Sequence, residues 1–478
     1  MIYADILNKR KEYKISQIKL SEVSGYSPAK ISAWELGKET PSANDVNVLM
    51  KSLNQIIEDI VSGVFDIRKK RIQHSGFAKN NLPKAIKSKE EYISMLERRG
   101  TVLNNAYRES LTKLFNRANS NVKNNSPKGI ALFSGCGGLS LGFEAAGFNL
   151  VGHLDIEESA NRIYKANFPN SDLLGTDICN TTDEQIHSWL NKYGDIDIII
   201  GGPPCQGFSL AGKRDPTDMR NQLYKYYVHM VSVIHPKVFV MENVRLLTSM
   251  RTTEGTLFID HIVQSFTNAG YRITRREINA SAYGVPQSRE RVILVGIRND
   301  MKAPFTFPEG EYTKDIEHLS CLFTGKKELT FKDATSDLCS LESGEVSKDP
   351  LHWSITHPEH VIKWLKDVPE GQSAHDNEDP KLRPPSGFNT TYKRILWDEP
   401  CSTISTNFSM ISGCRNVHPT NTRSLTIREA TRVQSFPDEF VFIGKWGDIR
   451  KAIGNAVPPL LAEKIAKAIF QQYFSLDA

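Results

Sequence analysis

The stretch that decides the fold is Ile196-Asp197-Ile198-Ile199-Ile200-Gly201-Gly202-Pro203-Pro204-Cys205. A short run of isoleucines is typical of a buried strand, and the glycines and prolines that follow end it. In an open parallel sheet, ligands bind at the carboxyl ends of the strands, which is where Cys205 would lie. A free cysteine is equally often a small buried residue. Considered alone, this stretch therefore leaves a packed thiol and a nucleophile open.

Short apolar strands alternate with helices from Gly129 onwards. The expected strands are 130–133, 150–154, 196–200, 238–241 and 292–297, and the expected helices include 159–167, 224–234, 426–434 and 460–473. This alternation predicts a parallel, doubly wound α/β sheet. The rhythm breaks over residues 299–423, where prolines and isolated aromatic residues predominate. We therefore expect a smaller loop-rich domain inserted between two parts of the sheet domain, 129–298 and 424–478.

The first 128 residues have a different pattern. Residues 1–75 contain short helical segments with caps and turns, which predicts an all-α domain. Residues 88–115 predict one amphipathic helix that packs against the neighbouring domain, with an apolar stripe formed by Tyr92, Leu96, Leu103, Tyr107, Leu111 and Leu114. Residues 116–128 are polar and rich in asparagine, as linkers often are. We expect residues 76–128 to form a helical connector and linker.

Composition and charge exclude several classes of protein. The chain has 478 residues and a net charge of +5, but the first 128 residues contain 23 Lys and Arg against 13 Asp and Glu. Such a basic region suits phosphate-backbone binding, although a solvated face can have the same charge. The seven scattered cysteines form no Cys-x-x-Cys pair, which argues against a disulfide framework and a zinc site. No apolar run suits a membrane span or a signal peptide, so we expect a cytoplasmic protein without a metal or a membrane partner.

Three turns at the expected strand ends suit a nucleotide-like cofactor. Residues 133–139, Phe-Ser-Gly-Cys-Gly-Gly-Leu, follow the first strand and begin a helix, so the backbone can approach a ligand closely. Asp155 ends the second strand and could accept hydrogen bonds from ribose hydroxyls. Asp177 ends the next segment and could meet an adenine amino group. These turns predict an adenosine-containing cofactor, but do not distinguish S-adenosylmethionine from a nicotinamide dinucleotide.

Charged residues follow at the same expected edge of the sheet. The strand 238–241 continues into Glu242, which places a carboxyl group there. Arg289 and Arg291 precede the strand 292–297, and their spacing on an extended segment would point both side chains the same way. An arginine pair is often only solvated, but this pair leads into the core. With these neighbours, Cys205 is better explained as a nucleophile.

Six motifs occur in order: FSGCGG, PPCQGFS, ENV, QSRERV, LTIREATRVQSFPD and GNAVPP. This set resembles the ordered motifs of the cytosine-5 DNA methyltransferase family, over about residues 128–473. The resemblance implies an S-adenosylmethionine-dependent methyltransferase fold that acts on double-stranded DNA. Because C5 chemistry needs space above and below the ring, the target cytosine must leave the duplex.

The resemblance also implies a role for each catalytic candidate. Cys205 would add to C6 of the cytosine, so that C5 can accept the methyl group. Glu242 would hold the N3 and amino edge of the base, Arg289 its carbonyl, and Arg291 would position the site. The sequence does not identify the base that removes the C5 proton.

Twelve positions match the cofactor-binding positions of the family. They are Phe133, Gly135, Gly137, Leu139, Asp155, Ile156, Asp177, Ile178, Pro203, Leu223, Asn455 and Val457. Family members often have an aromatic or bulky apolar residue after the ribose-binding acid, which stacks on adenine; Ile156 can offer the adenine only apolar contact.

The resemblance assigns the DNA contacts of the catalytic part to two segments. Residues 206–222, which include Lys213 and Arg214, would form a lid that closes over DNA. The insert 299–423 would be the target-recognition domain. Spacing identifies neither the residues that read bases nor the recognition sequence.

Residues 31–42, Ile-Ser-Ala-Trp-Glu-Leu-Gly-Lys-Glu-Thr-Pro-Ser, resemble the helix-turn-helix of phage repressors. A helix ending at Gly25 and a second one with Ser27 as N-cap and Pro28 at its first position fit this motif. Ile31 and Trp34 are expected in the core. The resemblance implies DNA contacts for five residues: Gln17 to phosphate, and Ser27, Ala29, Lys30 and Ala33 in the major groove. A helical packing module without a DNA-binding role is the alternative.

Three functions follow from these patterns. The favoured one is the modification methyltransferase of a restriction–modification system, acting as a monomer on its methylation site, with an N-terminal domain that binds a promoter operator, as a dimer, and represses it. The second is a DNA-binding regulator with a decayed methyltransferase body, which the intact catalytic motifs oppose. The third is an RNA cytosine methyltransferase, which the large insert and the repressor-like domain disfavour.

Overall fold

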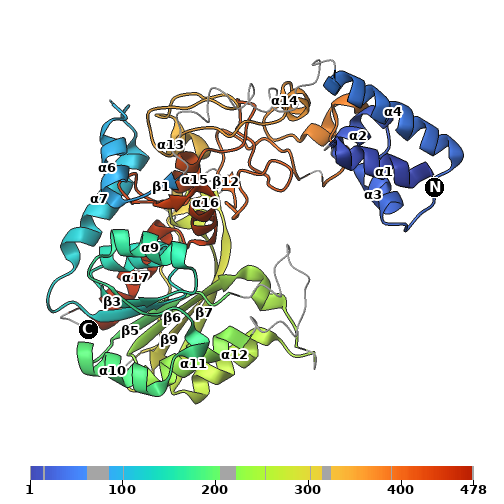
Figure 1. The fold of residues 1–478 in the computed structure, drawn as a ribbon. Helices are drawn as coiled ribbons and strands as arrows, with labels where there is room; N and C mark the ends of the chain where they lie inside the picture. Colours follow the sequence, from blue (N-terminus) through green and yellow to red (C-terminus); the bar gives the residue numbers. More distant parts are fainter. Residues whose placement is uncertain are drawn as a thin grey trace. The chain divides into compact units, whose positions relative to one another are not determined.

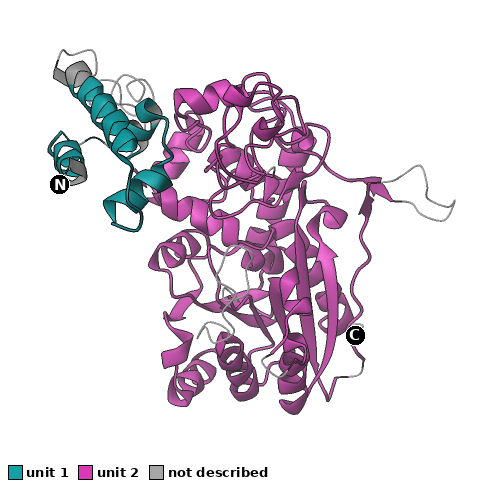
Figure 2. Ribbon diagram, turned by 90° about the vertical axis from the view of Figure 1, so that its right-hand side faces the viewer, with its two compact units in different colours: residues 1–81 teal, residues 82–478 magenta. Residues whose placement is uncertain are grey.

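The computed structural model describes residues 2–13, 15, 17–61, 85–100, 102–204, 222–252, 255–301, 303–314, 325–388 and 390–475. Contacts divide the chain into two compact units, residues 1–81 and 82–478, which Figure 2 shows in two colours. Each unit has hydrophobic cores of its own. Within the described ranges, no helix is both long and apolar enough for a bilayer.

The first unit is a bundle of helices (Figure 1). Its helices are α1 (Ile2–Glu12), α2 (Gln17–Ser24), α3 (Pro28–Glu35) and α4 (Ala43–Val61). Ser27 accepts a hydrogen bond from the backbone N–H of Lys30 at 3.2 Å, and Pro28 opens α3 as its fixed backbone angle favours. Ile31 and Trp34 are buried in the core. The predicted cap and core positions are confirmed.

A seven-stranded sheet forms the centre of the second unit. Its strands are β2 (Lys128–Leu132), β3 (Asn149–Leu154), β4 (Asp172–Gly175), β5 (Ile198–Gly201), β6 (Val238–Val244), β7 (Tyr271–Asn279) and β9 (Glu290–Arg298), in the spatial order β4-β3-β2-β5-β6-β9-β7. The prediction of a wholly parallel sheet is wrong at one strand. β9 runs antiparallel to both neighbours, because a hairpin-like return from β7 replaces the helical crossover that a parallel pair needs.

Helices cover both faces of this sheet, as the doubly wound prediction requires (Figure 1). On one face, α8 (Gly138–Ala145) and α17 (Pro459–Tyr473) pack against the sheet in one core. On the other, α10 (Asp183–Tyr193), α11 (Leu223–Ile234) and α12 (Phe258–Asn268) share a second core with it. α9 (Glu158–Asn167) and α16 (Trp446–Asn455) complete the domain. The C-terminal helices therefore close a sheet that begins more than 300 residues earlier.

The connector contains two helices rather than the single helix predicted over 88–115. α6 spans Lys89–Glu97 and α7 spans Ala106–Asn121. Gly100 has a φ of +82°, and Asn105 caps α7 by accepting from the backbone N–H of Arg108 at 2.8 Å. Leu103, placed on the predicted stripe, lies between the helices and is 66 % exposed. The predicted linker is also too long, because α7 continues to Asn121.

Few regular elements occur in the insert 299–423. Among its described residues, they are the three-residue helices Ala374–Asp376 and Pro380–Leu382, together with β10 (Tyr312–Thr313), β11 (Lys326–Lys327), α13 (Phe331–Thr335), α14 (Glu359–Leu365) and β12 (Cys401–Ser402). The last of these pairs with β8 (Gln287–Ser288), while β1 (Ala85–Ile86) of the connector pairs with β13 (Gly444–Lys445). The insert is loop-rich, as predicted.

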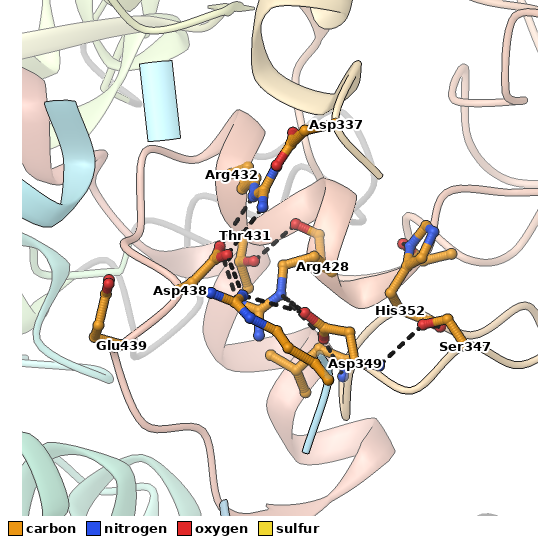
Figure 3. Close-up of polar contacts among 12 residues, drawn as sticks. Asp337, Ser347, Asp349, His352, Arg428, Thr431, Arg432, Asp438 and Glu439 are labelled. Carbon is orange, nitrogen blue, oxygen red and sulfur yellow. Dashed lines mark hydrogen bonds and ion pairs between the residues drawn. The ribbon is translucent and has the colours of Figure 1, made fainter. Parts of the chain in front are cut away.

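Buried ion pairs join the insert to α15 (Ile427–Val433), as Figure 3 shows. Arg428 lies 3.0 Å from Asp349 and 3.3 Å from Asp438, and Arg432 lies 2.9 Å from Asp438 and also pairs with Asp337. Both arginines are fully buried. Buried charges need partners of opposite sign, and these five side chains supply them to one another.

The connector contributes to the same network. Arg99 donates to Asp438 at 2.6 Å, and the Tyr92 hydroxyl donates to the Asp438 backbone carbonyl at 2.9 Å. Arg428 in turn donates to the Tyr92 oxygen at 3.2 Å. The connector, the insert and α15 are therefore held together by one set of charges.

Candidate active site

The carboxyl ends of β4, β3, β2, β5 and β6 lie at one edge of the sheet, because these strands are mutually parallel. The segment after β5 is fixed to the end of β6: Asn243 donates from its side-chain amide to the Pro203 carbonyl at 2.8 Å. Gly202 adjoins Glu242, since a Cβ there would lie 2.9 Å from the Glu242 Oε2 atom. The glycine thus permits the close approach of the two strand ends. Cys205 itself lies outside the described residues.

Glu242 and Arg291 form an ion pair at this edge. The Arg291 Nε atom lies 2.8 Å from Glu242 Oε1, and the two side chains are 14 % and 12 % exposed. The strand register explains the contact: Glu242 stands opposite Ile293 and Val244 opposite Arg291, so the pair are diagonal neighbours on one face. This places a carboxylate with an adjacent guanidinium beside the turn that leads to Cys205.

Arg289 has different partners, although the spacing predicted that both arginines point the same way. It lies between β8 and β9, is 2 % exposed, and donates to the carbonyls of Ile404 and Gly454, both at 3.1 Å. Burial and the nearby Arg291 lower the pKa of Arg289, while Glu242 opposes the shift. Arg289 therefore connects the insert to the segment before Asn455.

Two buried glutamines extend this connection. Gln287 accepts from the Ile404 backbone N–H at 2.8 Å and donates to the Gln434 side chain at 2.9 Å. Gln434 in turn donates to the Ile453 carbonyl at 2.7 Å. These hydrogen bonds hold together four segments that are distant in sequence, around residues 287, 404, 434 and 453.

The glycine turn after β2 is bonded to the end of β3. Asp155 accepts from the backbone N–H groups of Gly135 and Glu157, each at 2.8 Å. Burial raises the pKa of Asp155, and the two N–H groups oppose that shift. Gly138 opens α8 beneath the C-terminal motif, since a Cβ there would lie 2.4 Å from the Val457 carbonyl oxygen. The first and last motifs therefore meet at this turn.

The other predicted cofactor positions differ in exposure. Leu139, Ile178, Pro203, Val457 and Gly137 are buried, Phe133, Gly135, Asp177 and Leu223 are half-buried, and Ile156 and Asn455 are exposed. Phe133 has a φ of +50°, in the left-handed region. Asp177 caps the short helix Ile178–Asn180 through a bond from the Cys179 backbone N–H at 3.0 Å.

These residues fit a cofactor that carries an adenosine. Asp155 provides a carboxylate at the end of β3, and the adjacent Ile156 side chain is 68 % exposed. Among the described residues, no atom lies within 4 Å of a Cβ built on Gly135, which leaves open space over the turn. A carboxylate, an exposed apolar side chain and an open glycine turn together suit a ribose hydroxyl, an adenine ring and a charged tail.

The predicted DNA contacts are only partly described. Lys213 and Arg214 lie outside the described residues. In the first unit, Ser27, Ala29 and Lys30 are exposed and Ala33 is half-buried. Gln17, expected at a phosphate, donates to Glu35 at 2.6 Å.

Sequence reasoning missed the residues that support the site. Asn243, Gln287 and Gln434 are buried or nearly so and act through backbone carbonyls or one another. Each of the three lies within one of the six sequence motifs, ENV, QSRERV and LTIREATRVQSFPD. A side-chain amide inside such a motif was the only sequence signal that could have indicated a supporting role. Their partners could not be predicted, because each contact joins segments that are distant in the chain.

The fold and the site define a doubly wound α/β protein with an acid–guanidinium pair beside the turn that leads to Cys205. Residues 127–471 match the family model "C-5 cytosine-specific DNA methylase", and residues 6–55 match a helix-turn-helix model. The chain belongs to the C-5 cytosine-specific DNA methylase family, and carries a helix-turn-helix domain at its N-terminal end. The predicted family, fold class and enzyme class are confirmed.

Named relatives share the same region. The chain is 36 % identical to the type II methyltransferase M1.HphI of Haemophilus parahaemolyticus over 72 % of its own length and 86 % of the relative. It is 33 % identical to M.DdeI of Desulfomicrobium norvegicum over 71 % and 88 %. Among solved structures, a candidate DNA modification methyltransferase encoded within an E. coli prophage is similar at a TM-score of 0.55 and 26 % identity, over 73 % of this chain and 99 % of that one.

Proposed function

We propose that this chain is the modification methyltransferase of a restriction–modification system, which uses S-adenosylmethionine to methylate C5 of a flipped cytosine within a specific duplex sequence. The Glu242–Arg291 pair beside the turn that leads to Cys205 carries this proposal. Relatives named type II methyltransferases, at 32–36 % identity, support the restriction–modification context. Such an enzyme works in the cytoplasm on DNA.

Cys205 is the nucleophile in this proposal. Its thiolate forms a bond to C6, and the electron pair of the C5=C6 bond becomes available at C5. S-adenosylmethionine, when bound, supplies a methyl group on a positively charged sulfur. Loss of the C5 proton then restores the double bond, and the electrons of the S–C6 bond leave with Cys205.

Glu242 and Arg291 recognise the flipped base and stabilise its developing charge. Glu242 shares a proton with N3, because a carboxylate and a ring nitrogen that are both acceptors cannot otherwise bond. Arg291 neighbours Glu242 and is accessible, so we assign the base carbonyl to Arg291. Arg289, which donates only to protein carbonyls among its described contacts, is a positioning residue. This exchanges the two roles expected from the sequence.

The cofactor lies over the glycine turn in this proposal. Asp155 binds the ribose, and Ile156 contacts the adenine ring by apolar packing alone. Asp177 and Ile178 complete the adenine site, while Phe133, Gly135, Gly137, Leu139, Pro203, Leu223, Asn455 and Val457 surround the remainder of the cofactor. The hydrogen bond that the Gly135 N–H donates to Asp155 supports this assignment, because it fixes the acid at the turn.

The remaining segments of the second unit contact DNA. The insert 299–423 is the target-recognition domain, and residues 206–222, with Lys213 and Arg214, form the lid. The enzyme acts on its methylation site as a monomer. The sheet domain comprises 129–298 and 424–478, and the connector 76–128 joins it to the first domain, 1–75.

The direct test is methyl transfer. Incubating the chain with labelled S-adenosylmethionine and either duplex DNA or tRNA, then mapping the modified cytosines, should give 5-methylcytosine in one DNA sequence. Cys205→Ser should remove turnover while leaving cofactor binding intact. Methyl transfer to tRNA alone would contradict the DNA assignment, and full activity of the serine variant would contradict the covalent mechanism.

We further propose that the first unit binds an operator as a dimer and represses a promoter. The observation that favours this function is the capped α3, which exposes Ser27, Ala29 and Lys30 while burying Ile31 and Trp34. Deleting residues 1–75 should abolish promoter binding and largely preserve methylation. Equal loss of both activities would show that the two functions are not separable.

A further inference from the structure

The outward face of α3 is formed mainly by methyl-bearing side chains, with one serine among them. Ile31 and Trp34 mark its buried side, being 0 % and 5 % exposed. At 100° per residue, Ala29, Ser32, Ala33 and the C-cap residue Leu36 stand on the opposite side. Leu36 is 66 % exposed, Ala29 is exposed and Ala33 is half-buried. This helix therefore presents to solvent a short stripe of methyl-bearing side chains with the Ser32 hydroxyl beside it.

Glu35, the acidic residue of α3, already has hydrogen-bond partners within the first unit. Glu35 pairs with Arg10 through two bonds of 2.7 and 2.8 Å, and accepts from Gln17 at 2.6 Å. These contacts occupy the guanidinium and the amide nearest to α3. The helix itself, Pro28–Glu35, contains neither an arginine nor an asparagine or glutamine.

The one cation of α3 is drawn to the side of the stripe. The Lys30 ammonium lies 5.3 Å from the centre of the Tyr26 ring and 5.0 Å from that of Trp34. The Tyr26 hydroxyl donates to Asp45 at 2.6 Å, and hydrogen bonds from Tyr26 and Ser42, aided by the charge of Lys30, lower the pKa of Asp45 to about 2. Aromatic rings and a carboxylate therefore compete with DNA for Lys30.

Exposed methyl groups on a helix can recognise methyl groups of bases in the major groove. Arginine, asparagine and glutamine distinguish purines by paired hydrogen bonds, which alanine cannot make, whereas alanine contacts the C5-methyl group of thymine. 5-Methylcytosine carries its methyl group on the same ring carbon, at the same groove edge. Cytosine and uracil have only hydrogen there.

We propose that Ala29 and Ala33 recognise C5-methyl groups of pyrimidines, so that the first unit prefers DNA containing thymine or 5-methylcytosine at the contacted positions. This inference rests on the proposed operator binding. 5-Methylcytosine is the product of the reaction proposed for the second unit, so operator occupancy would rise with methylation. Each contacted methyl group should strengthen binding about fourfold, the value of one buried carbon group.

The experiment uses the full chain carrying Cys205→Ala, without added methyl donor, so that the probes stay unmodified. Binding sequences are selected from a random duplex library, and those that depend on the first unit are identified with Ala29→Glu. Ala43→Glu, at an exposed position in α4 of the same unit, is the matched control. The dissociation constant of a selected duplex is then measured with single thymines replaced by uracil, and with single cytosines replaced by 5-methylcytosine.

We expect uracil at a contacted position to weaken binding about fourfold, and 5-methylcytosine in place of cytosine to strengthen it equally. Both effects should disappear in Ala29→Glu and persist in Ala43→Glu. If uracil weakens binding but 5-methylcytosine does not strengthen it, the first unit recognises only the thymines of the operator. That result would overturn the proposal that it responds to the methylated product.

The failures are distinguishable. If binding depends on Ala29 but not on any methyl group, the operator function stands and methyl recognition is wrong. If Ala29→Glu changes no binding while its thermal unfolding matches the parent chain, DNA binding by the first unit is itself refuted. The base substitutions need no change in the protein, so a misfolded variant would not affect them.

Discussion

Arg99, just after α6, donates from its Nη1 atom to Asp438 Oδ2 at 2.6 Å across 339 residues of sequence. The same carboxylate is paired with Arg428 and Arg432. Burial opposes ionisation of Asp438, but the charges of Arg428 and Arg432 hold its pKa well below the ordinary value. The connector is therefore part of the electrostatic frame that supports the insert, and this relationship can be tested by substitution.

Replacing Arg99 should weaken the fold. Arg99→Met leaves Asp438 with two of its three cations, and the Arg99 side chain is 18 % exposed, so the cost is smaller than for a fully buried pair. We expect the free energy of unfolding to fall by about 1–2 kcal/mol in urea titrations. Arg98→Met is the matched control, because the neighbouring Arg98 is exposed. Equal losses in the two variants would argue against the Asp438 contact.

Asp438 should make stability depend on pH. Because its folded pKa is lowered, its contribution is present above the unfolded value, near 4, and is lost as the pH falls toward the folded value. Asp438→Asn should therefore be less stable than the parent at neutral pH, with the difference narrowing in acid below about pH 4. Urea titrations from neutral to acidic pH measure this, and a constant difference would contradict it.

A methyl group at the glycine turn should impair cofactor binding. In Gly138→Ala, the new Cβ would lie 2.4 Å from the Val457 carbonyl oxygen, so the C-terminal motif must move. We expect the dissociation constant for S-adenosylmethionine, measured by calorimetry, to rise about tenfold, as for an overpacking cost of about 1.4 kcal/mol. Gly447→Ala, with no described atom within 4 Å of its Cβ, should leave it unchanged.

Substitutions of Arg291 and Arg289 should have different effects on rate and stability. Arg291→Met should lower the single-turnover rate by about 100-fold or more, because it removes a charge at the reacting base, and should lower the free energy of unfolding by about 1–2 kcal/mol, because Glu242 loses its partner. Arg289→Met should chiefly lower the free energy of unfolding, since it leaves the carbonyls of Ile404 and Gly454 unpaired. A larger rate loss in the Arg289 variant, at equal stability, would restore the roles that the sequence suggested.

Much of the fold follows from local patterns. The isoleucine run before Gly201 and the alternation after Gly129 predict strands with only small differences in their bounds. The reversal of β9 was missed because direction is a matter of pairing, which no local pattern contains. The break between α6 and α7 was missed for a different reason. The apolar stripe continues across it, while Gly100 and the Asn105 cap decide the backbone.

The candidate site was predictable by residue type but not by contact. Glu242 and Arg291 were both identified, yet their pairing depends on the register between β6 and β9. The spacing Arg289-x-Arg291 predicted only that the two side chains point the same way. Arg289 lies between β8 and β9 and is enclosed, whereas Arg291 lies within β9 and its side chain is 14 % exposed. Only the tertiary arrangement distinguishes the two.

The shared charges also constrain how this protein can evolve. The insert provides Asp337 and Asp349, while their cations belong to α15. A wholesale exchange of the insert for one from another enzyme would leave both buried arginines with Asp438 as their shared acid, unless the new insert carried acids at equivalent positions. Change confined to surface loops within the insert carries no such cost. On the proposal that the insert recognises the target sequence, new preferences are reached more easily by gradual loop variation than by transplanting the whole insert.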